Sequence, residues 1–446
     1  MKRPTITARR SGLLSTLRWR TRITLWLAAL AAGVVVAGFA KLAELALALF
    51  GELTSGKPWL AFLLSPLVGM STVWLTRRSF PGAQGSGIPQ VIAATRLAAQ
   101  GKAIQQLVSL RIAFGKVSLG AFALIGGFSS GREGPSVQVA ASILHAAHKL
   151  LPNTRALRAS DLILAGGAAG VAAAFNTPLA GIVFAVEELG RRLETRTSGV
   201  LVSTIILSGL VAIALLGNYN YFGHVRDGRS DQSLLLPVIA AGMACGVFGG
   251  LFSRLMLLPM NFRKHALWRW RETHPILFAG SCGVLVALTG FISDGVSYGS
   301  GYTITAQVVA GQLELPWYAA PSRFVATLAS YYSGIPGGIF APSLAIGAAI
   351  GSPLTSLLGI GDGIPAFIAL CMAGFLAAVT QAPITAAIIV MEMIDGHGMV
   401  ISLMAVTLIA KAIASRISPE LYQQLALGFL PSPQQDPAQQ QPPRTP

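Results

Sequence analysis

Long uncharged apolar runs recur along this chain of 446 residues, and each is long enough to cross a lipid bilayer as a helix. These runs occupy residues 23–40, 198–225, 232–253, 274–293, 324–361 and 363–391. Backbone N–H and C=O groups inside lipid must bond to one another, so spanning runs of this kind are expected to be helical. Charged residues make up only 11% of the chain. The sequence therefore predicts an all-α polytopic membrane protein.

The net charge of +16 could indicate a polyanionic partner such as nucleic acid. The basic residues, however, gather at the ends of the apolar runs, at 2–22, 77–78, 149–158, 191–196, 254–271 and 411–416. That distribution is typical of positively charged cytoplasmic loops, so we expect no nucleic-acid partner. Residues 1–22 carry seven Lys/Arg and no acid, which predicts a basic cytoplasmic N-terminal segment. The apolar run that follows continues to Phe50, too long for a cleaved signal peptide.

Three motifs of the first half return, in the same order, in the second half. The pairs are Gly85-Ser86-Gly87 with Gly299-Ser300-Gly301, residues 131–136 with 338–343, and Asn176-Thr177-Pro178 plus Glu187 with Gln381-Ala382-Pro383 plus Glu392. Duplicated halves with short helices interrupted by glycine and proline point to a transporter whose site lies between the repeats. We expect membrane repeat 1 at 23–216, membrane repeat 2 at 217–428, and a disordered, Pro/Gln-rich cytoplasmic tail at 429–446.

The segment Gly131-Arg132-Glu133-Gly134-Pro135 has the composition of an anion site. Pro135 is predicted to open an apolar helix from Ser136 to about Leu150, and the glycines leave backbone N–H groups bare before it. Such amides, at the positive end of a helix dipole, bind anions. Helices opened by proline are expected at Pro89, Pro135, Pro178, Pro342 and Pro383. The alternative is that these prolines only break membrane helices.

Glu133 lies beside this predicted anion site. A tethered carboxylate can occupy the site when it is charged and leave it when it is protonated, which would make a proton-controlled gate. The alternative is a structural ion pair with Arg132. A charge at membrane depth costs on the order of 2.5–3.5 kcal/mol on insertion scales, which favours a functional role.

Glu187 and Glu188 end the helix that Pro178 opens, where acids are disfavoured by the helix dipole. One interpretation is a cytoplasmic helix end neutralised by nearby arginines at 191 and 192. Because the repeat pairs Glu187 with Glu392, we expect a shared structural role for that pair and a functional role for Glu188. Lys116, inside an apolar run, either extends toward the interface or adds positive potential for anions.

No metal or organic cofactor is indicated. His145 and His148 have HxxH spacing but no acid or further histidine nearby, so a charged or solvated helix end is favoured over a metal site. Cys245, Cys282 and Cys371 are scattered and suggest neither a disulfide nor a metal. An intramembrane enzyme using Glu133 or the pair His145 and His148 is disfavoured, because the chain has no HExxH motif, nucleophile elbow or Ser/Lys dyad.

The motifs together resemble those of the CLC chloride channel and transporter family. The matching segments are GSGIP (85–89), GREGP (131–135), GGIFAP (337–342) and the late Leu421-Tyr422, and they occur in the family's order. The resemblance extends from the first span to about residue 428. It implies a CLC-like fold with two inverted repeats of tilted and broken helices, assembled as a homodimer with one ion pathway per subunit.

The resemblance also implies roles for single residues. Ser86 and Tyr422 would supply hydroxyls to a bound chloride, and Ile339 and Phe340 would supply backbone N–H groups. Gly134 completes the chloride-binding set that the resemblance implies. It makes Glu133 the external gate and Glu188 the internal proton-transfer glutamate.

By the same resemblance the protein exchanges chloride for protons, and a passive chloride channel of the same family is the alternative. An acid at Glu188 favours exchange, Ser86 favours chloride over nitrate, and GREGP with Tyr422 argues against the fluoride-exporting branch. The implied partners are chloride, protons, the lipid bilayer and a second copy of the chain, and chloride is bound as a substrate. The absence of cytoplasmic regulatory domains suggests a prokaryotic-type, multi-pass protein of the bacterial inner membrane, with both termini in the cytoplasm.

Overall fold

The computed structural model describes residues 16–151, 157–190, 198–217, 221–223, 225, 235–361 and 363–431. Most of the predicted N-terminal segment, the arginines at 191 and 192 and nearly all of the predicted tail lie outside these residues. Throughout the described ranges the regular secondary structure is helical, apart from two isolated β-bridges.

The first half of the chain contains α2 (Thr16–Thr54), α3 (Ala61–Ser79), α4 (Ile88–Ala99), α5 (Leu110–Ile125), α6 (Glu133–Ala147), α7 (Ala159–Phe175), α8 (Pro178–Phe184), a π-helical turn η3 (Ala185–Gly190) and α9 (Ser198–Leu216). The second half contains α10 (Leu235–Met256), α11 (Leu258–Asn261), α12 (Ala266–Thr273), α13 (Pro275–Ile292), α14 (Tyr302–Val309), α15 (Ala319–Ser333), α16 (Phe340–Leu357), α17 (Ile364–Thr380), α18 (Pro383–Met393), α19 (Val400–Ile417) and α20 (Leu421–Leu427). Short 3-10 turns occur at Pro58–Leu60, His148–Leu150 and His397–Met399.

Six helices among the described residues are long and apolar enough to cross a membrane. They are Trp19–Thr54, Pro58–Ser79, Leu235–Met256, Pro275–Ile292, Phe340–Leu357 and His397–Ile417. Shorter apolar helices, including Ala159–Phe175 and Ile364–Thr380, are almost wholly buried among them. The prediction of an all-α polytopic membrane protein is confirmed.

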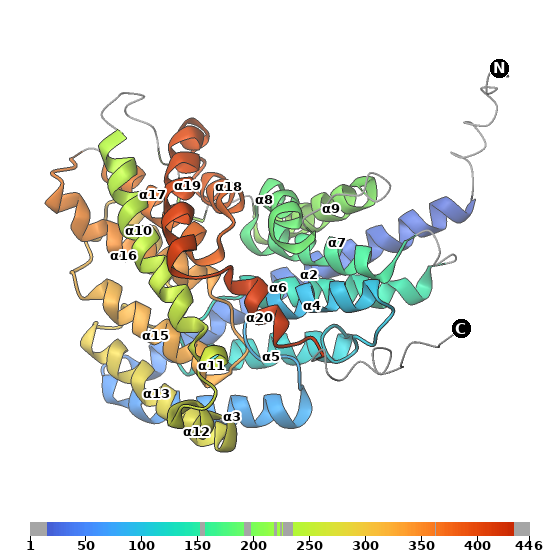
Figure 1. Cartoon of the computed structure of the whole chain (residues 1–446), viewed down its shortest axis with the longest axis horizontal. Coiled ribbons are helices and arrows are strands. Elements are labelled where there is room, and N and C mark those ends of the chain that lie inside the picture. Colours follow the sequence, from blue (N-terminus) through green and yellow to red (C-terminus); the bar gives the residue numbers. More distant parts are fainter. Residues whose placement is uncertain are drawn as a thin grey trace, which may run out of the picture.

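The helices of the two halves pack in corresponding patterns (Figure 1). α6 packs on α7 as α16 packs on α17, and α2 packs on α9 as α10 packs on α19. The halves meet where α3 lies along α13 and where α8 contacts α18. The last helix, α20, lies between α4 of the first half and α10 and α17 of the second (Figure 1). Residues distant in the sequence are thereby brought to one central region.

Three of the long apolar runs do not form single helices. The run 324–361 is broken between α15 and α16, because Gly334 takes φ +85° and the following residues pair with other loops. The run 363–391 is broken after Gln381, at φ +60°, where Pro383 starts a new helix. Within 198–225 the helix ends at Leu216, before Gly217 at φ +89°. Proline and left-handed backbone end a helix even where the surrounding side chains are apolar.

The start of α6 also differs from the prediction. The helix begins at Glu133, not at Ser136, and its last regular residue is Ala147. Pro135 is therefore the third residue of the helix, as Pro342 is of α16. Since the first helical N–H groups have no acceptor within the helix, a proline is tolerated throughout the first turn. Glu133 consequently belongs to the tip of the helix itself.

Candidate anion site at the broken helices

The loops that precede the broken helices are hydrogen-bonded to one another. The Gly85 N–H donates to the carbonyl of Ile335 at 3.0 Å, and the Gly337 N–H donates to the carbonyl of Gly85 at 3.1 Å. Gly131 and Gly338 exchange two backbone hydrogen bonds of 2.8 and 2.7 Å. These short bridges bring the starts of α4, α6 and α16 together, although the segments lie far apart in the sequence.

Two glycines permit this close approach. A Cβ atom on Gly338 would lie 2.9 Å from the backbone nitrogen of Gly134 and 3.0 Å from the Cδ of Pro135. A Cβ atom on Gly134 would lie 2.3 Å from the Oγ of Ser86. Contacts this short are not tolerated, so any side chain here would push the helix tips apart. Gly134 and Ser86, both predicted site residues, are therefore neighbours.

Ser86, Tyr422 and Phe340 also lie together. All three side chains are buried, and the ring of Tyr422 stacks on the ring of Phe340 with centroids 6.0 Å apart. The hydroxyls of Ser86 and Tyr422 lie close enough to interact, but neither forms a well-aligned hydrogen bond with any described protein atom. Buried hydroxyls normally have a partner, and a bound anion would accept a hydrogen bond from each.

The backbone of α16 contributes further donors. Ile339 is the N-cap residue and Phe340 the first residue of this helix, and both are buried. The N–H groups of a first turn have no acceptor one turn earlier, and they lie at the positive end of the helix dipole. The structure thus brings five predicted residues, Ser86, Gly134, Ile339, Phe340 and Tyr422, to one buried region whose polar groups are chiefly donors.

The carboxylate of Glu133 lies between the tips of α6 and α16. Its side chain is only 1% exposed, and its Oε1 accepts a hydrogen bond of 2.8 Å from the Tyr302 hydroxyl. The carboxylate also lies beside the backbone N–H of Ala341, and its Oε2 has no well-aligned hydrogen bond among the described residues. A Cβ atom on Gly131 would lie 2.2 Å from this Oε2. The carboxylate thus faces the amides of a helix tip, where an anion would bind.

Arg132 contacts Glu133 only weakly. The separation between its Nε and the Glu133 Oε1 is 4.0 Å. Its guanidinium donates at shorter range to the carbonyl of Ala40 (2.8 Å), to Glu44 (3.1 Å) and to the Tyr221 hydroxyl (2.6 Å). The principal role of Arg132 is to tie this loop to α2 and to Tyr221. A simple structural ion pair with Glu133 is therefore not favoured.

Lys116 does not extend toward the membrane interface. It is fully buried, and its ammonium group donates to the carbonyls of Ala83 (2.8 Å), Gln84 (3.3 Å) and Gly85 (2.7 Å). The interpretation as an interfacial lysine is wrong, because three carbonyls immediately before Ser86 supply the polar environment that water would otherwise supply. A positive charge therefore lies beside the start of α4.

Arg323 makes the corresponding contact in the second half, and the sequence analysis missed it. This buried arginine donates to the carbonyls of Val296, Tyr298 (3.2 Å) and Gly299 (3.2 Å), immediately before the second glycine motif. The offset of 207 residues between Lys116 and Arg323 also relates Glu133 to Phe340. That offset was the signal that could have identified it.

Glu187, which follows α8, caps the N-terminus of α18, and Glu392, which lies in α18, caps the N-terminus of α8. The carboxylate of Glu187 accepts from the backbone N–H of Thr385 at 2.7 Å, in the first turn of α18. The carboxylate of Glu392 accepts from the N–H of Ala180 at 2.9 Å, in the first turn of α8. The predicted structural role of this pair is confirmed, because each acid supplies the acceptor that a helix N-terminus lacks.

Glu188 is buried in the π-helical turn η3, with 4% of its surface exposed. The Gln423 amide donates to the backbone carbonyl of Glu188 at 3.1 Å and to its Oε1 at 3.4 Å. Arg96 in turn donates to the amide oxygen of Gln423. Because Gln423 follows Tyr422 in α20, one short helix contacts both Glu188 and the region around Ser86.

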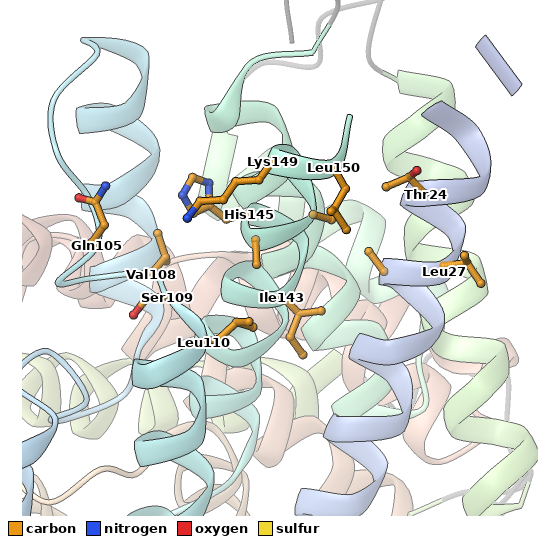
Figure 2. Close-up of a pocket in the computed structure, with 13 residues that line it drawn as sticks. Thr24, Leu27, Gln105, Val108, Ser109, Leu110, Ile143, His145, Lys149 and Leu150 are labelled. Atoms are coloured by element: carbon orange, nitrogen blue, oxygen red, sulfur yellow. The ribbon is translucent and has the colours of Figure 1, made fainter. Parts of the chain in front are cut away.

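Two cavities differ in their relation to these residues. A cavity of about 420 Å³ is lined by Arg132, Tyr221 and Tyr302, next to Glu133. A larger cleft of about 710 Å³, shown in Figure 2, lies near the opposite end of α2 and includes His145 and Lys149. The residues of α2 in the two cavities are about twenty positions apart, roughly 30 Å along a helix. The larger cleft is therefore separate from the candidate site.

The described residues thus form a polytopic helical membrane protein with a buried polar site at the tips of broken helices. Residues 68–415 match the family model described as voltage gated chloride channel, and the chain belongs to this family.

Solved structures of this family share the fold. An X-ray structure of a slow cyanobacterial Cl⁻/H⁺ antiporter matches with a TM-score of 0.80 at 24% identity, over 92% of this chain and 98% of that one. A CLC-type fluoride/proton antiporter matches with a TM-score of 0.75 at 22% identity, over 94% and 99%. A eukaryotic CLC transporter matches with a TM-score of 0.73 at 21% identity, over 91% and 74%. The predicted CLC-like fold is confirmed.

Proposed function

We propose that this protein exchanges chloride for protons across a membrane. The observation that carries the proposal is the position of the Glu133 carboxylate, buried beside the backbone amide of Ala341 at the tip of α16. A carboxylate in that position competes with a mobile anion for the same donors. Similarity to structures described as Cl⁻/H⁺ and F⁻/H⁺ antiporters supports the assignment of an exchanger.

Chloride is held by donors and by no formal positive charge in direct contact. The hydroxyls of Ser86 and Tyr422 bind it from one side, and the first-turn amides of Ile339 and Phe340 bind it from the other. Gly134 keeps the Ser86 segment close to the tip of α6. Hydrogen bonds to an anion are stronger than neutral ones, and the helix dipole adds to them. Without a direct ion pair the anion can still leave, as transport requires.

Glu133 acts as the external gate. When ionised, its carboxylate occupies the outer end of the anion path and excludes chloride from it. Protonation removes the negative charge, so the side chain gives up the amides and an incoming chloride replaces it. Chloride and the charged carboxylate repel each other, and this repulsion couples chloride movement to proton movement.

Glu188 passes protons between the gate and the cytoplasm. It contacts Gln423 in α20, the residue that follows Tyr422. The Tyr422 hydroxyl is within electrostatic reach of both Glu133 and Glu188. The protein between the two acids is largely apolar, so a proton crosses it through transient water. No ATP is needed, because a chloride gradient drives proton movement and a proton gradient drives chloride movement.

We propose chloride, not fluoride, as the anion because GREGP (131–135) and Tyr422 are both present. The alternative to exchange is a passive chloride channel. The functional unit is a homodimer with two inverted repeats and one pathway per subunit. It resides in a bacterial inner membrane with both termini in the cytoplasm.

Chloride-driven proton uptake tests the proposal. The purified protein is reconstituted into liposomes with an outward chloride gradient, so that chloride efflux drives proton uptake, and the external pH is recorded. Wild-type protein is expected to move protons against their gradient. Glu188→Gln and Glu133→Gln should abolish proton movement but still pass chloride, whereas the neighbouring control Glu187→Gln should keep coupling. Chloride flux without proton movement in the wild type would establish the channel alternative.

A further inference from the structure

The Tyr302 hydroxyl donates a 2.8 Å hydrogen bond to the buried Oε1 of Glu133. We propose that Tyr302 is a latch that holds the charged gate in its inward position and sets the pH at which the gate opens. The inference rests on the proposed gating role of Glu133 and adds a positioning residue to it. A neutral O–H donor stabilises a carboxylate more than it stabilises the protonated acid, so the latch favours the closed gate.

The backbone of Tyr302 is held firmly. It is the first residue of α14, immediately after Gly301, which takes φ +85°. A Cβ atom on Gly301 would lie 2.6 Å from a guanidinium nitrogen of Arg323 and 2.7 Å from the Cβ of Ala345. This tight packing, together with the bonds from Arg323 to the preceding loop, fixes the origin of the tyrosine side chain.

The ring of Tyr302 is held as well. It packs on the ring of Tyr221 with centroids 5.0 Å apart and on Phe222 at 5.8 Å, and the Arg132 guanidinium lies 5.8 Å from its centre. Tyr221 is itself anchored, because its hydroxyl accepts from Arg132 and donates to the carbonyl of Ala174 at 2.8 Å. A donor on a rigid ring loses little conformational freedom when it forms its bond, so this bond is an effective restraint.

The hydrogen bond between Tyr302 and Glu133 lies at the edge of a cavity. Tyr302, Arg132 and Tyr221 line the cavity of about 420 Å³, whereas Glu133 is 1% exposed and lies behind them. Breaking the hydrogen bond from the Tyr302 hydroxyl would therefore allow the Glu133 carboxylate to move toward this cavity. Ile88 occupies the corresponding position at the start of α4, so a hydroxyl is not required to begin such a helix.

Several other charged or titratable groups face Glu133, and the test must separate the latch from them. Arg132 lies 4.0 Å away on the same segment, and Tyr422 of α20 is within electrostatic reach. Arg132 is in turn bound to Glu44 of α2 and to Tyr221. Replacing Tyr302 by phenylalanine removes one hydroxyl and leaves each of these groups in place.

The experiment measures chloride efflux from liposomes as a function of pH for the wild type and Tyr302→Phe. Without its donor the ionised carboxylate is less stable, so the pH of half-maximal efflux should rise by about one unit. The matched control is Tyr298→Phe, which also loses a partly buried hydrogen bond, from its hydroxyl to the carbonyl of Ala287 at 3.1 Å. The control should leave the pH profile unchanged.

The same substitution is then made in the Glu133→Gln background, forming a double-mutant cycle. If Tyr302 acts through the carboxylate, the double variant should carry chloride at the rate of Glu133→Gln, which also shows that it is folded. An unshifted pH profile in Tyr302→Phe, or an equal effect of the substitution in both backgrounds, would overturn the latch and leave the exchanger intact. Proton transport that persists in Glu133→Gln would instead overturn the proposed function.

Discussion

Lys116 and Arg323 make the same kind of contact in the two halves of the chain, 207 residues apart. Each buried cation donates to three carbonyls, of which one belongs to the first glycine of a Gly-Ser-Gly motif and two belong to the residues before it. Carbonyls bonded to a buried cation are satisfied without water. Near Ser86 this arrangement commits three carbonyl oxygens to the Lys116 ammonium group.

Replacing Lys116 with methionine should weaken both the fold and chloride binding. Three buried carbonyls would lose a charged donor, at a cost of about 2–3 kcal/mol, and a positive charge near Ser86 would be lost. Thermal unfolding in detergent and chloride titration calorimetry measure the two effects. Lys57→Met, at an exposed position, is the control. An unchanged unfolding temperature for Lys116→Met would show that the three hydrogen bonds contribute little.

Gly134→Ala should disrupt the candidate site without unfolding the protein. Its Cβ would lie 2.3 Å from the Ser86 Oγ, so Ser86 must move away from the tip of α6. Chloride affinity should fall by at least about tenfold, the change that 1.4 kcal/mol produces. Gly38→Ala, where a Cβ meets no atom within 4 Å, should leave affinity unchanged. Equal affinity in the two variants would remove Ser86 and Gly134 from the binding site.

Substitution of the capping acids Glu187 and Glu392 should lower stability, whereas substitution of the adjacent Glu188 should abolish proton movement. Glu187→Ala and Glu392→Ala each remove a cap from a helix N-terminus, which typically costs about 0.5–2 kcal/mol. Both variants should unfold at lower temperature while keeping proton-coupled chloride transport. Loss of coupling in either variant, at full chloride flux, would contradict the purely structural role of this pair.

Gln423→Leu should slow proton transfer more than chloride transport. The substitution removes the amide that bonds to the carbonyl and carboxylate of Glu188 and that accepts from Arg96. Without it the carboxylate loses one restraint on its orientation toward α20. The ratio of proton to chloride flux in liposomes measures the effect, with the neighbouring Gln424→Leu as control. If both variants keep the wild-type ratio, Gln423 does not position Glu188.

Several features of the molecule could be predicted from local sequence. Helix breaks at Pro178 and Pro383 follow from proline geometry. Hydropathy and basic residues predict a first span to Phe50, which the helix exceeds by four residues to end at Thr54, and the end of the next span at Arg77 and Arg78. The domain boundary at 216/217 stays a prediction. A new helix at Pro342 was predicted within the run 324–361, but the end of the preceding helix at Ser333 was not, because residues 334–338 bond to loops from the first half.

Other features depend on contacts that no local pattern contains. The burial of Lys116 depends on carbonyls some thirty residues earlier, and the contact between Tyr302 and Glu133 joins residues 169 apart. Hydropathy reports how much of a segment is apolar but not which distant carbonyl or hydroxyl lies opposite a charged side chain. For that reason Lys116 was left with two interpretations, and Arg323 and Tyr302 were not identified as parts of the site.

The amino-acid sequence by itself determined that this is a polytopic helical membrane protein, since uncharged runs of bilayer length have one stable environment. It also placed glycine and proline where helices must stop, so that bare amides arise inside the membrane. Only the tertiary structure decided which of these helix tips meet and which side chains face them. The meeting depends on backbone bonds between Gly131 and Gly338 and between Gly85 and the 335–337 segment, which form only when the two halves pack together.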